Sequence, residues 1–442
     1  MEPSAKVSRF RNSTGKSGIK KVRKRKEQTM MRMQIPTQVE QIISTLKKGG
    51  FEAYAVGGCV RDTLLGRTPG DWDITTSAHP EEVKALFRRT IDTGIRHGTV
   101  TIMMDRTGYE VTTYRIDGEY EDGRHPKQVE FTSNLLEDLK RRDFTINAMA
   151  YSHETGIVDA FGGMEDLENG TIRCVGNAME RFTEDALRIL RAIRFSAQLD
   201  FSIEQETWDS IFTIAPNIAK VSKERIQVEL TKLLLSNHPE HMKLVYETGI
   251  SNYVSPAFAG LSWEKLDIPV SLPVEKYVRW AAFLRCAKVC GKMDAASRTA
   301  VQVLKDLKLD NDTIAKVRTL VKWSGVNLEP ESSGLGQSEA SAASGGSVKP
   351  AAVRRAMSQM EPEVWDALVE LNGYDEEIRR LTRDIRESGD CLDLKHLAVN
   401  GQDLIRAGVK PGKEMGSILN HLLELVLEQP ELNEKDVLLE RI

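Results

Sequence analysis

The stretch "AVGGCVRDTLLGRTPGDWDIT", residues 55–75, decides the fold of the N-terminal part of the chain. A short apolar run ends at a Gly-Gly pair, a helix is predicted from about Cys59, and "DWDIT" predicts a second strand. Successive side chains of a strand point to opposite faces, so Asp71 and Asp73 would share one face. Two carboxylates this close repel each other unless a cation lies between them. The pair is therefore a candidate metal site, although acid pairs also occur on solvated strand faces.

The turn between the first predicted strand and the helix suits a phosphate group. Gly58 lets the backbone approach a ligand, and a helix N-terminus offers free N–H groups and a favourable dipole to an anion. Arg61 adds a forked donor for phosphate oxygens. From these residues alone, a tight turn with a surface salt bridge between Arg61 and Asp62 is an equally good interpretation.

Glu110 adds a third acid on a later predicted strand, the second of a hairpin with its turn at residues 105–108. A glycine turn, an acid pair and an isolated acid on a later strand together supply a phosphate-binding turn and convergent carboxylates. Such carboxylates can hold two Mg²⁺ ions, which activate a hydroxyl and stabilise a leaving pyrophosphate. The combination favours nucleotidyl transfer. In such a site Arg142, from "KRRDFTINAMA" at residues 140–150, is interpreted as a triphosphate or ribose contact.

The stretch "EDALRILRAIRF", residues 184–195, places Asp185 and Arg188 three positions apart on a predicted helix, as neighbours on one surface. An acceptor beside a donor matches cytosine and adenine, which present an amino donor next to a ring-nitrogen acceptor, and opposes uracil and guanine. Such a pair could select CTP and ATP without a template strand. Arg191 and Arg194 remain for phosphate contacts or packing. A helical salt bridge with a basic stripe is the structural alternative.

Composition and charge limit the class of protein. The chain has 442 residues, enough for roughly three domains, with 40% hydrophobic and 29% charged residues. The net charge of −4 excludes an overall basic nucleic-acid binder, so any RNA contact must come from local patches. Five cysteines are scattered without zinc-ligand spacing, which suits a reducing compartment. No apolar run is long enough to span a membrane and there is no signal-peptide segment, so we expect the cytoplasm.

The character of the sequence changes along the chain. Residues 1–33 are rich in Lys, Arg, Ser and Gly and predict a disordered basic arm. Short β-rich runs then alternate with helical stretches as far as about Val175, which predicts an α/β module with a small sheet. After Phe182 the strands are expected to stop and helical periodicity takes over, with helices beginning at the predicted N-caps Thr183 and Ser222.

These elements, in this order, resemble the class II tRNA nucleotidyltransferases, the CCA-adding enzymes, and the similar bacterial poly(A) polymerases. The resemblance runs from about Gln34 to the C-terminus and rests also on "RHGTVTIM", "VTTYR", "GIVDAFGGMEDLENGTIRCVG" and "VNGQDLIRAGVKPGKEMGSIL". It implies a polymerase β-like α/β head with a small mixed sheet, followed by all-helical neck, body and tail domains. The implied divisions are a head at 34–180, a base-recognising neck at 181–235, a body at 236–328, a Ser/Gly-rich linker or loop at 329–350 and a tRNA-binding tail at 351–442.

The resemblance also assigns residues. It implies that Asp71 and Asp73 are catalytic and hold Mg²⁺, and that Glu110 falls where the wider superfamily keeps a third acid. The implied nucleotide site contains Gly58, Arg61, Arg142, Asp185, Arg188, Arg191 and Arg194. Residues 116–132 resemble the flexible loop that full CCA-adding enzymes possess and CC-adding relatives lack.

The reaction implied by the resemblance is template-independent addition of C, C and A to the 3′ end of tRNA. CTP and ATP are the nucleotide partners, pyrophosphate is released, and the tRNA is held by its 3′ end and its elbow. CC-only addition, A-only addition, poly(A) tailing and non-catalytic RNA binding are the alternatives. The sequence leaves open the oligomeric state and how the selected nucleotide changes from C to A.

Overall fold

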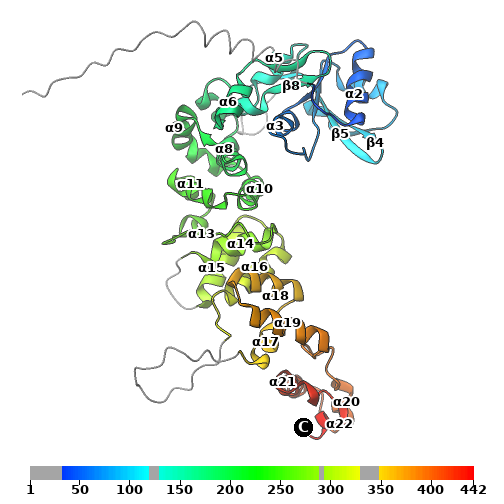
Figure 1. Cartoon of the computed structure of the whole chain (residues 1–442), viewed down its shortest axis with the longest axis vertical. Helices are drawn as coiled ribbons and strands as arrows, with labels where there is room; N and C mark the ends of the chain where they lie inside the picture. The colour runs from blue at the N-terminus through cyan, green and yellow to red at the C-terminus, as the bar shows by residue number, and fades with distance from the viewer. Residues whose placement is uncertain (1–31, 119–128, 288–292, 329–347) are drawn as a thin grey trace, which may run out of the picture. The chain divides into compact units, whose positions relative to one another are not determined.

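A computed structural model describes residues 32–118, 129–287, 293–328 and 348–442 (Figure 1). The chain divides into two compact units, Met1–Val254 and Ser255–Ile442. The predicted basic arm at 1–33 lies almost wholly outside the described residues, as does most of the predicted linker. Of that linker the described part begins with Val348, which is buried.

The first unit is built around a mixed sheet of seven strands in the order β3-β4-β5-β2-β1-β8-β9. The strands are β1 Ala53–Val56, β2 Ile74–Thr76, β3 Thr90–Gly94, β4 Thr99–Met104, β5 Thr107–Thr113, β8 Met149–Ser152 and β9 Gly156–Asp159. Strand β2 runs parallel to β5, and the other neighbouring pairs are antiparallel. The predicted α/β head with a small mixed sheet is therefore confirmed.

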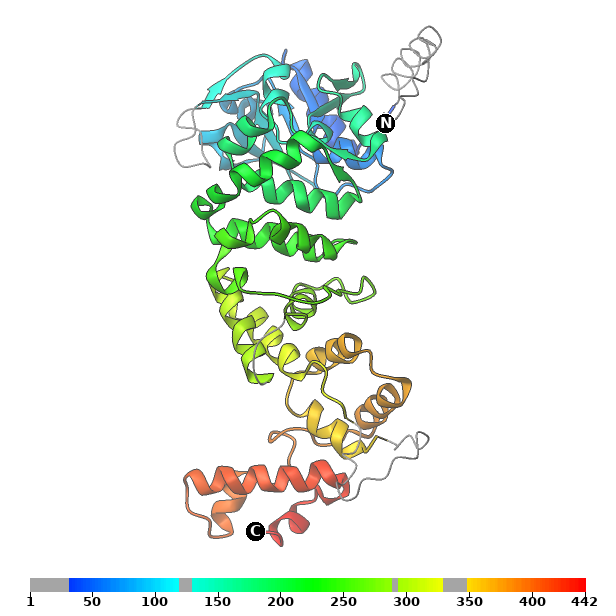
Figure 2. The same ribbon diagram turned by 90° about the vertical axis from the view of Figure 1, so that its left-hand side faces the viewer.

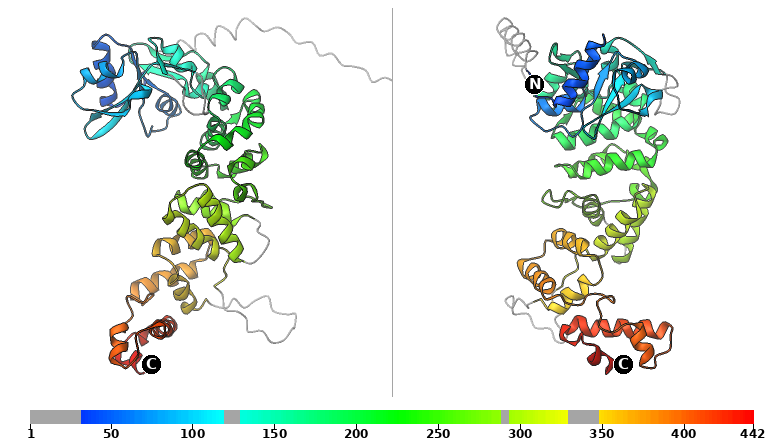
Figure 3. Two further views of the ribbon diagram at one scale, coloured as in Figure 1. Left: turned by 180° about the vertical axis from the view of Figure 1, so that it is seen from behind. Right: turned by 90° about the vertical axis from the view of Figure 1, so that its right-hand side faces the viewer.

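Helices cover the sheet because its two faces are both apolar. The helices are α2 Thr37–Lys48, α3 Gly58–Leu64, α4 Pro80–Leu86, α5 Leu135–Lys140 and α6 Gly163–Asn169, with the short 3₁₀ turns η1 Ile95–His97 and η2 Thr145–Asn147. Helices α2 and α4 share a hydrophobic core with one face of the sheet, and α2 is the blue helix in Figures 1 and 3. Leu135 and Leu139 of α5 pack with Tyr54 and Val56 of β1 on the opposite face.

Strands β4 and β5 form the predicted hairpin, but its turn is shorter than expected. Asp105 and Arg106 alone connect them, and both have positive φ, 50° and 66°. Two such residues make the tight turn whose twist matches the flanking strands. Thr107 and Gly108, predicted within the turn, instead pair with Met104 and Met103 as part of β5.

The first unit continues as helices α7 Ala178–Glu184, α8 Leu187–Leu199, α9 Gln205–Ile214, α10 Lys223–Leu234, α11 Met242–Glu247 and α12 Ser251–Val254, with 3₁₀ turns η3 Ala215–Lys220 and η4 Pro239–His241. Two short sheets stand beside the main one: β6 Arg115–Asp117 with β7 Val129–Phe131, and β10 Thr171–Ile172 with β11 Ser202–Ile203. The expectation that strands stop after Phe182 is therefore wrong, because β11 pairs in parallel with β10. The predicted loop at 116–132 includes most of β6 and all of β7, and its residues 119–128 lie outside the described part.

One predicted helix start is wrong and the other is confirmed. Thr183 lies inside α7, where its hydroxyl donates to the carbonyl of Met179, so it caps no helix. Ser222 does occupy the N-cap position of α10, in an extended conformation. The chain leaves the helical conformation at Asp185, so α7 and α8 are two helices where the periodicity suggested one.

The second unit contains helices and no strands among its described residues. Its helices are α13 Pro256–Ala259, α14 Lys276–Arg285, α15 Met293–Asp306, α16 Asn311–Trp323, α17 Pro350–Met357, α18 Pro362–Asn372, α19 Glu376–Ser388, α20 Gly401–Arg406, α21 Lys413–Glu428 and α22 Lys435–Leu439, with the 3₁₀ turn η5 Pro430–Leu432. Helix α21, the long red helix in Figure 2, packs Leu422 and Val426 against Leu404 of α20. None of the helices in the described ranges has the length and apolar character needed to cross a membrane.

Candidate active site

Three acids lie near one another where β2 and β5 run side by side. The sequence predicted that Asp71 and Asp73 lie on a strand, but both precede β2, which begins at Ile74. The carbonyl of Asp73 still accepts a hydrogen bond of 3.0 Å from the N–H of Val56 in β1. Between the two aspartates, Trp72 packs against the core, as expected of its alternate position. Strands β2 and β5 pair in parallel from Ile74 and Val111 onward. Asp73 and Glu110 each directly precede one member of that pair, so they occupy adjoining positions on the same face.

These three acids, hereafter the acid cluster (Asp71, Asp73 and Glu110), lie close enough for their charges to act on one another. Burial raises the pKa of Asp73, Arg142 opposes that rise, and the neighbouring Asp71 adds to it. Burial also raises the pKa of Glu110, and the charges of Asp73 and Asp71 raise it further. Carboxylates whose charges raise the pKa of their neighbours are the setting that a bound cation stabilises.

The acid cluster suits a divalent cation whose coordination is completed by the bound substrate. Among the described residues, no three His, Cys, Asp or Glu side chains are grouped closely enough to hold a metal ion by themselves. Mg²⁺ is commonly held by one or two carboxylates together with substrate phosphates and water, and it needs no cage made wholly of protein. Asp71 and Asp73 supply oxygen ligands of that kind.

The glycine turn lies beside the acid cluster, and its more constrained residue is Gly57. Gly57 has φ 82° and ψ −130°, and its N–H donates to the carbonyl of Met149. A Cβ atom on Gly57 would also lie 3.0 Å from Nη1 of Arg142. Gly58 begins α3, and a Cβ there would make an ordinary contact of 3.6 Å with Nη2 of Arg61. Positive φ therefore favours glycine at position 57, and a larger side chain there would also displace the guanidinium of Arg142.

Arg142 lies next to the acid cluster. Its Nη1 is close to Gly57, its charge lowers the pKa of Asp73, and its Nη2 forms an ion pair of 3.4 Å with Asp138 of α5. The Nε atom of Arg142 is buried and has no hydrogen-bond partner among the described residues. Arg142 therefore lies beside carboxylates and a glycine turn, which are the surroundings that the sequence predicted for it.

Arg61 is buried in the head, with 8% of its surface exposed, so the surface salt bridge considered above does not describe it. It does pair with Asp62, but its Nη1 also donates to Oδ1 of Asn147 over 2.6 Å. Its guanidinium lies 5.0 Å from the ring centroid of Phe195 on α8. Arg61 therefore connects the glycine turn to η2 and to the arginine-rich helix.

Asp185 and Arg188 do not lie on one helix, contrary to the prediction. Asp185 is extended, with φ −142° and ψ 101°, and Arg188 is in the first turn of α8. The two residues remain adjacent because the N–H of Arg188 donates to the carbonyl of Asp185 over 3.0 Å. The Asp185 carboxylate accepts from the N–H of Leu187 and from Nη2 of Arg225, the latter over 2.7 Å. Asp185 therefore lies just before α8, whose N-cap position is Ala186, and does not project from the side of that helix.

The arginine row (Arg188, Arg191 and Arg194) has partners within the protein. Arg188 donates to Glu184 over 2.7 Å and to the carbonyls of Arg181 and Arg141. Arg191 pairs with Asp143, and Arg194 pairs with Glu229 of α10, each over 2.5 Å. Burial alone would raise the pKa of Asp143, but Arg191 and Asn147 hold it well below the usual carboxyl value. Arg194 is buried and also lies 3.8 Å from the Phe195 ring centroid, which favours the packing role that the sequence left open for it.

Comparison with known proteins decides the family. Family models match three segments: "Poly A polymerase head domain" at residues 53–173, "Probable RNA and SrmB- binding site of polymerase A" at 200–261 and "tRNA nucleotidyltransferase domain 2 putative" at 352–442. The CCA-adding enzyme of Leuconostoc mesenteroides is 38% identical over 403 residues, which cover 90% of this chain and 94% of that protein. The chain belongs to the CCA-adding enzyme family.

Solved structures of CCA-adding enzymes agree with this membership. The Bacillus stearothermophilus CCA-adding enzyme in complex with CTP matches with a TM-score of 0.72 and 33% identity, over 92% of this chain and 98% of that one. The Thermotoga maritima CCA-adding enzyme complexed with tRNA has the same fold, with a TM-score of 0.61 at 21% identity over 94% of this chain and 97% of that one. The predicted family resemblance and fold class are confirmed.

Two residues of the site were missed by the sequence reasoning. The sequence reasoning chose Gly58 as the glycine of the nucleotide site and did not choose Gly57. A Gly-Gly pair between a strand and a helix already indicates a positive φ at one of the two positions, and that position is Gly57. Asn147 was not considered. Its amide accepts from Arg61 and donates to Asp143, so it joins the two halves of the site. A polar residue inside the apolar run after "RRD" was the available signal.

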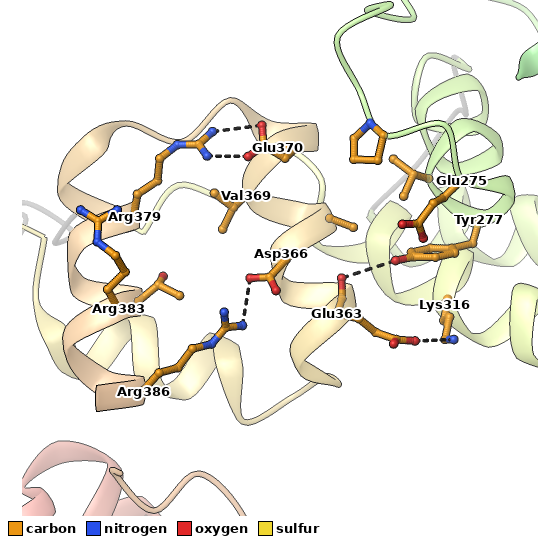
Figure 4. A pocket seen from close by; sticks show the side chains of 14 residues that line it. Glu275, Tyr277, Lys316, Glu363, Asp366, Val369, Glu370, Arg379, Arg383 and Arg386 are labelled. Carbon is orange, nitrogen blue, oxygen red and sulfur yellow. Dashed lines mark hydrogen bonds and ion pairs between the residues drawn. The ribbon is translucent and has the colours of Figure 1, made fainter. Parts of the chain in front are cut away.

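A pocket in the second unit has different chemistry from the acid cluster. It has a volume of about 590 Å³ and lies between α14, α16, α18 and α19 (Figure 4). Its acids face cations: Glu370 pairs with Arg379, Asp366 with Arg386, and Glu363 with Lys316. Three of its acids are therefore neutralised by cations, whereas the acids of the head raise one another's pKa, which makes the head the candidate active site of this CCA-adding enzyme family member.

Proposed function

We propose that this chain adds C, C and A to the 3′ end of tRNA without a template, using CTP and ATP and releasing pyrophosphate. The observation that carries the proposal is its 38% identity, over 90% of its length, to a protein named as a CCA-adding enzyme. The acid cluster beside Arg142 supplies matching chemistry in the head segment. No covalent intermediate is required, because the tRNA 3′-hydroxyl is itself the nucleophile.

Mg²⁺ is the metal that we propose for the acid cluster. Asp71 and Asp73 would hold it, with Glu110 close by. When bound, Mg²⁺ makes the 3′-hydroxyl more acidic and offsets the charge that develops on the leaving pyrophosphate. The chain's own contribution is to fix these carboxylates at the start of β2 and to bring a guanidinium up to them. Most of the rate enhancement then comes from positioning and electrostatic stabilisation.

The triphosphate is proposed to bind between the glycine turn and the arginines. Arg142 has a buried Nε without a hydrogen bond among the described residues, so a phosphate oxygen would satisfy a donor that the protein leaves open. Gly57 leaves space beside this guanidinium, where a larger side chain would crowd it. Arg61 would act from the opposite end of the turn. Arg191 and Arg194 are proposed to orient the site through Asp143 and Glu229.

Base selection is proposed to use Asp185 as acceptor and Arg188 as donor. Cytosine and adenine offer the complementary amino donor and ring-nitrogen acceptor, whereas uracil and guanine would leave buried groups unpaired. Both side chains already have protein partners, Arg225 for Asp185 and Glu184 for Arg188. Reading a base therefore requires these contacts to be shared or exchanged. That requirement makes the neck segment a place where specificity could change from C to A.

The remaining expectations belong to the same proposal. The boundaries 34–180, 181–235, 236–328 and 351–442 for head, neck, body and tail stay predictions, with the tail holding the tRNA elbow. We also propose a cytoplasmic location, because the four cysteines among the described residues, Cys59, Cys174, Cys286 and Cys391, are free thiols. The oligomeric state stays open.

Sequencing of product 3′ ends tests the proposed function. A tRNA transcript lacking its terminal CCA is incubated with the protein and all four nucleoside triphosphates. Products ending in a single CCA support the proposal. Products ending in CC, addition only to a tRNA that already ends in CC, or a run of A would assign one of the sibling activities. tRNA binding without pyrophosphate release would identify a non-catalytic RNA-binding protein.

A further inference from the structure

Asp138 of α5 is a buried charge that the proposed reaction does not use. Its side chain is fully enclosed, with 0% exposed. A carboxylate in such a place is costly unless it is paired and hydrogen-bonded. Asp138 meets that condition, because Arg141 and Arg142 surround it with positive charge. What matters for function is which elements this carboxylate joins.

The two oxygens of Asp138 face different parts of the head. Oδ1 accepts from Nε and Nη2 of Arg141, over 3.0 and 2.7 Å, and from the N–H of Arg115 over 3.4 Å. Oδ2 accepts from the hydroxyl of Thr75 over 3.2 Å and from Nη2 of Arg142 over 3.4 Å. Thr75 lies in β2, two residues after Asp73, so the alternation of extended backbone places both side chains on the same side of the chain. A single oxygen thus links the strand that follows the acid pair to the arginine that lies beside it.

Arg142 is confined between this oxygen and the glycine turn. On one side its Nη2 reaches Asp138, and on the other its Nη1 lies where a Cβ of Gly57 would approach to 3.0 Å. The contact that holds the guanidinium is therefore the ion pair with Asp138, and the absence of a side chain at Gly57 leaves room for it on the other side. Its Nε has no hydrogen bond among the described residues and is left for a ligand.

We propose that Asp138 is a positioning residue for nucleotide binding, which holds the guanidinium of Arg142 at a fixed distance from β2 and the acid cluster. Asp138 touches neither nucleotide nor metal and acts through Arg142. The inference rests on the proposed function, because it takes Arg142 to be a triphosphate contact. Neutralising Asp138 removes the ion pair and lets the guanidinium leave its position, whereas the sheet keeps its other contacts.

A double-mutant cycle tests this inference in the full-length protein. CTP dissociation constants are measured by calorimetry with Mg²⁺ for the wild type, Asp138→Asn, Arg142→Ala and the double variant. We expect each single substitution to weaken CTP binding by about tenfold, the size expected for one charge-assisted hydrogen bond. In the Arg142→Ala background, Asp138→Asn should weaken CTP binding almost no further, because Arg142, through which Asp138 acts, is absent. Additive losses would overturn the inference, as would unchanged binding in Asp138→Asn.

Two further variants separate positioning from stability. Asp403→Asn removes a comparably buried and salt-bridged carboxylate in the second unit, and we expect it to leave CTP binding unchanged. If Asp138→Asn does not fold, Thr75→Val removes the other contact of the same oxygen, and we expect about a threefold loss of CTP affinity. No loss with Thr75→Val would then overturn the inference. A wild type that binds no CTP would instead overturn the proposed function together with it.

Discussion

The acid cluster and the arginine row lie in the same unit and hold opposite kinds of charge balance. In the acid cluster, the charge of Asp71 raises the pKa of Asp73, both raise the pKa of Glu110, and Arg142 offsets only part of this repulsion. In the arginine row, each guanidinium meets a carboxylate, and Arg194 and Glu229 form a buried pair. The difference indicates that the acid cluster needs a cation to balance its charge. The arginine row already stabilises the fold, so it must share or exchange its contacts in order to read a nucleotide.

Neutralising the acid cluster should have the largest effect of the substitutions that test this difference between the two regions. We expect Asp73→Ala or Asp71→Ala to lower CTP incorporation by about a thousandfold or more, because the carboxylates that hold the metal are lost. The folded state should keep its stability or gain some without metal, since a repulsive charge is removed. Incorporation of labelled CTP and thermal unfolding in chelator measure the two effects. Near-normal incorporation would refute the metal assignment, and a large loss of stability would show that the cluster is structural.

Breaking the arginine row should have the opposite result, loss of stability. Glu229→Ala leaves Arg194 as an unpaired buried charge, and such changes cost about 3–5 kcal/mol. Urea unfolding followed by circular dichroism measures the change in the free energy of unfolding. As a matched control, Glu361→Ala alters an exposed acid at the start of α18 and should change stability little. A cost below about 1 kcal/mol for Glu229→Ala would mean that the pair is not structural.

Arg188→Ala sharpens the comparison within the arginine row. If Arg188 reads the base, discrimination of CTP against UTP should fall by about tenfold to a hundredfold in kcat/KM. The affinity for tRNA should change less than this selectivity. Arg194→Ala, assayed at a temperature where the variant is folded, should keep the original preference, because Arg194 acts through Glu229 and Phe195 and does not read the base. Equal selectivity in the wild type and Arg188→Ala would refute base reading by this residue.

The pH dependence of stability gives a smaller effect with a definite sign. The folded-state pKa of Asp143 is depressed, so its pairing with Arg191 stabilises the protein above the ordinary carboxyl pKa, near 3.9. The stabilisation is lost as the pH falls below that value, toward the depressed pKa. We expect the difference in unfolding free energy between the wild type and Asp143→Asn to be about 2 kcal/mol at pH 7 and to shrink below pH 4. A difference that grows on acidification would contradict the sign.

The sequence predicted the parts of the site that depend on local order. A strand, a glycine turn, a helix and an acid pair follow one another within residues 55–75, so their order alone placed Asp71 and Asp73 near Gly58. Parallel pairing of β2 with β5 then brings Glu110 beside Asp73. The order of elements and the family resemblance predicted the fold class of the head, although the hairpin turn is shorter than predicted and both aspartates precede β2.

Contacts over long distances in the sequence could not be predicted in the same way. The helical period across residues 184–195 did not indicate that Asp185 is non-helical. Its carboxylate accepts a hydrogen bond from Arg225, which lies 40 positions later in the sequence, and such a contact is not visible in a local pattern. The same limit applies to Asp138, whose partner Thr75 lies 63 positions earlier. A helical salt bridge with a basic stripe was the structural alternative for residues 184–195, and only the fold shows that Asp143 and Glu229, the partners of Arg191 and Arg194, are buried.

A crystal structure of the protein with CTP and Mn²⁺ in place of Mg²⁺ tests the central claim most directly. The anomalous signal locates the cation, and the density of the cytosine locates the base. We predict an anomalous peak between the carboxylates of Asp71 and Asp73, and the pairing edge of cytosine within hydrogen-bond distance of Asp185 and Arg188. A peak at another site, or a cytosine ring bound away from the start of α8, would contradict the account.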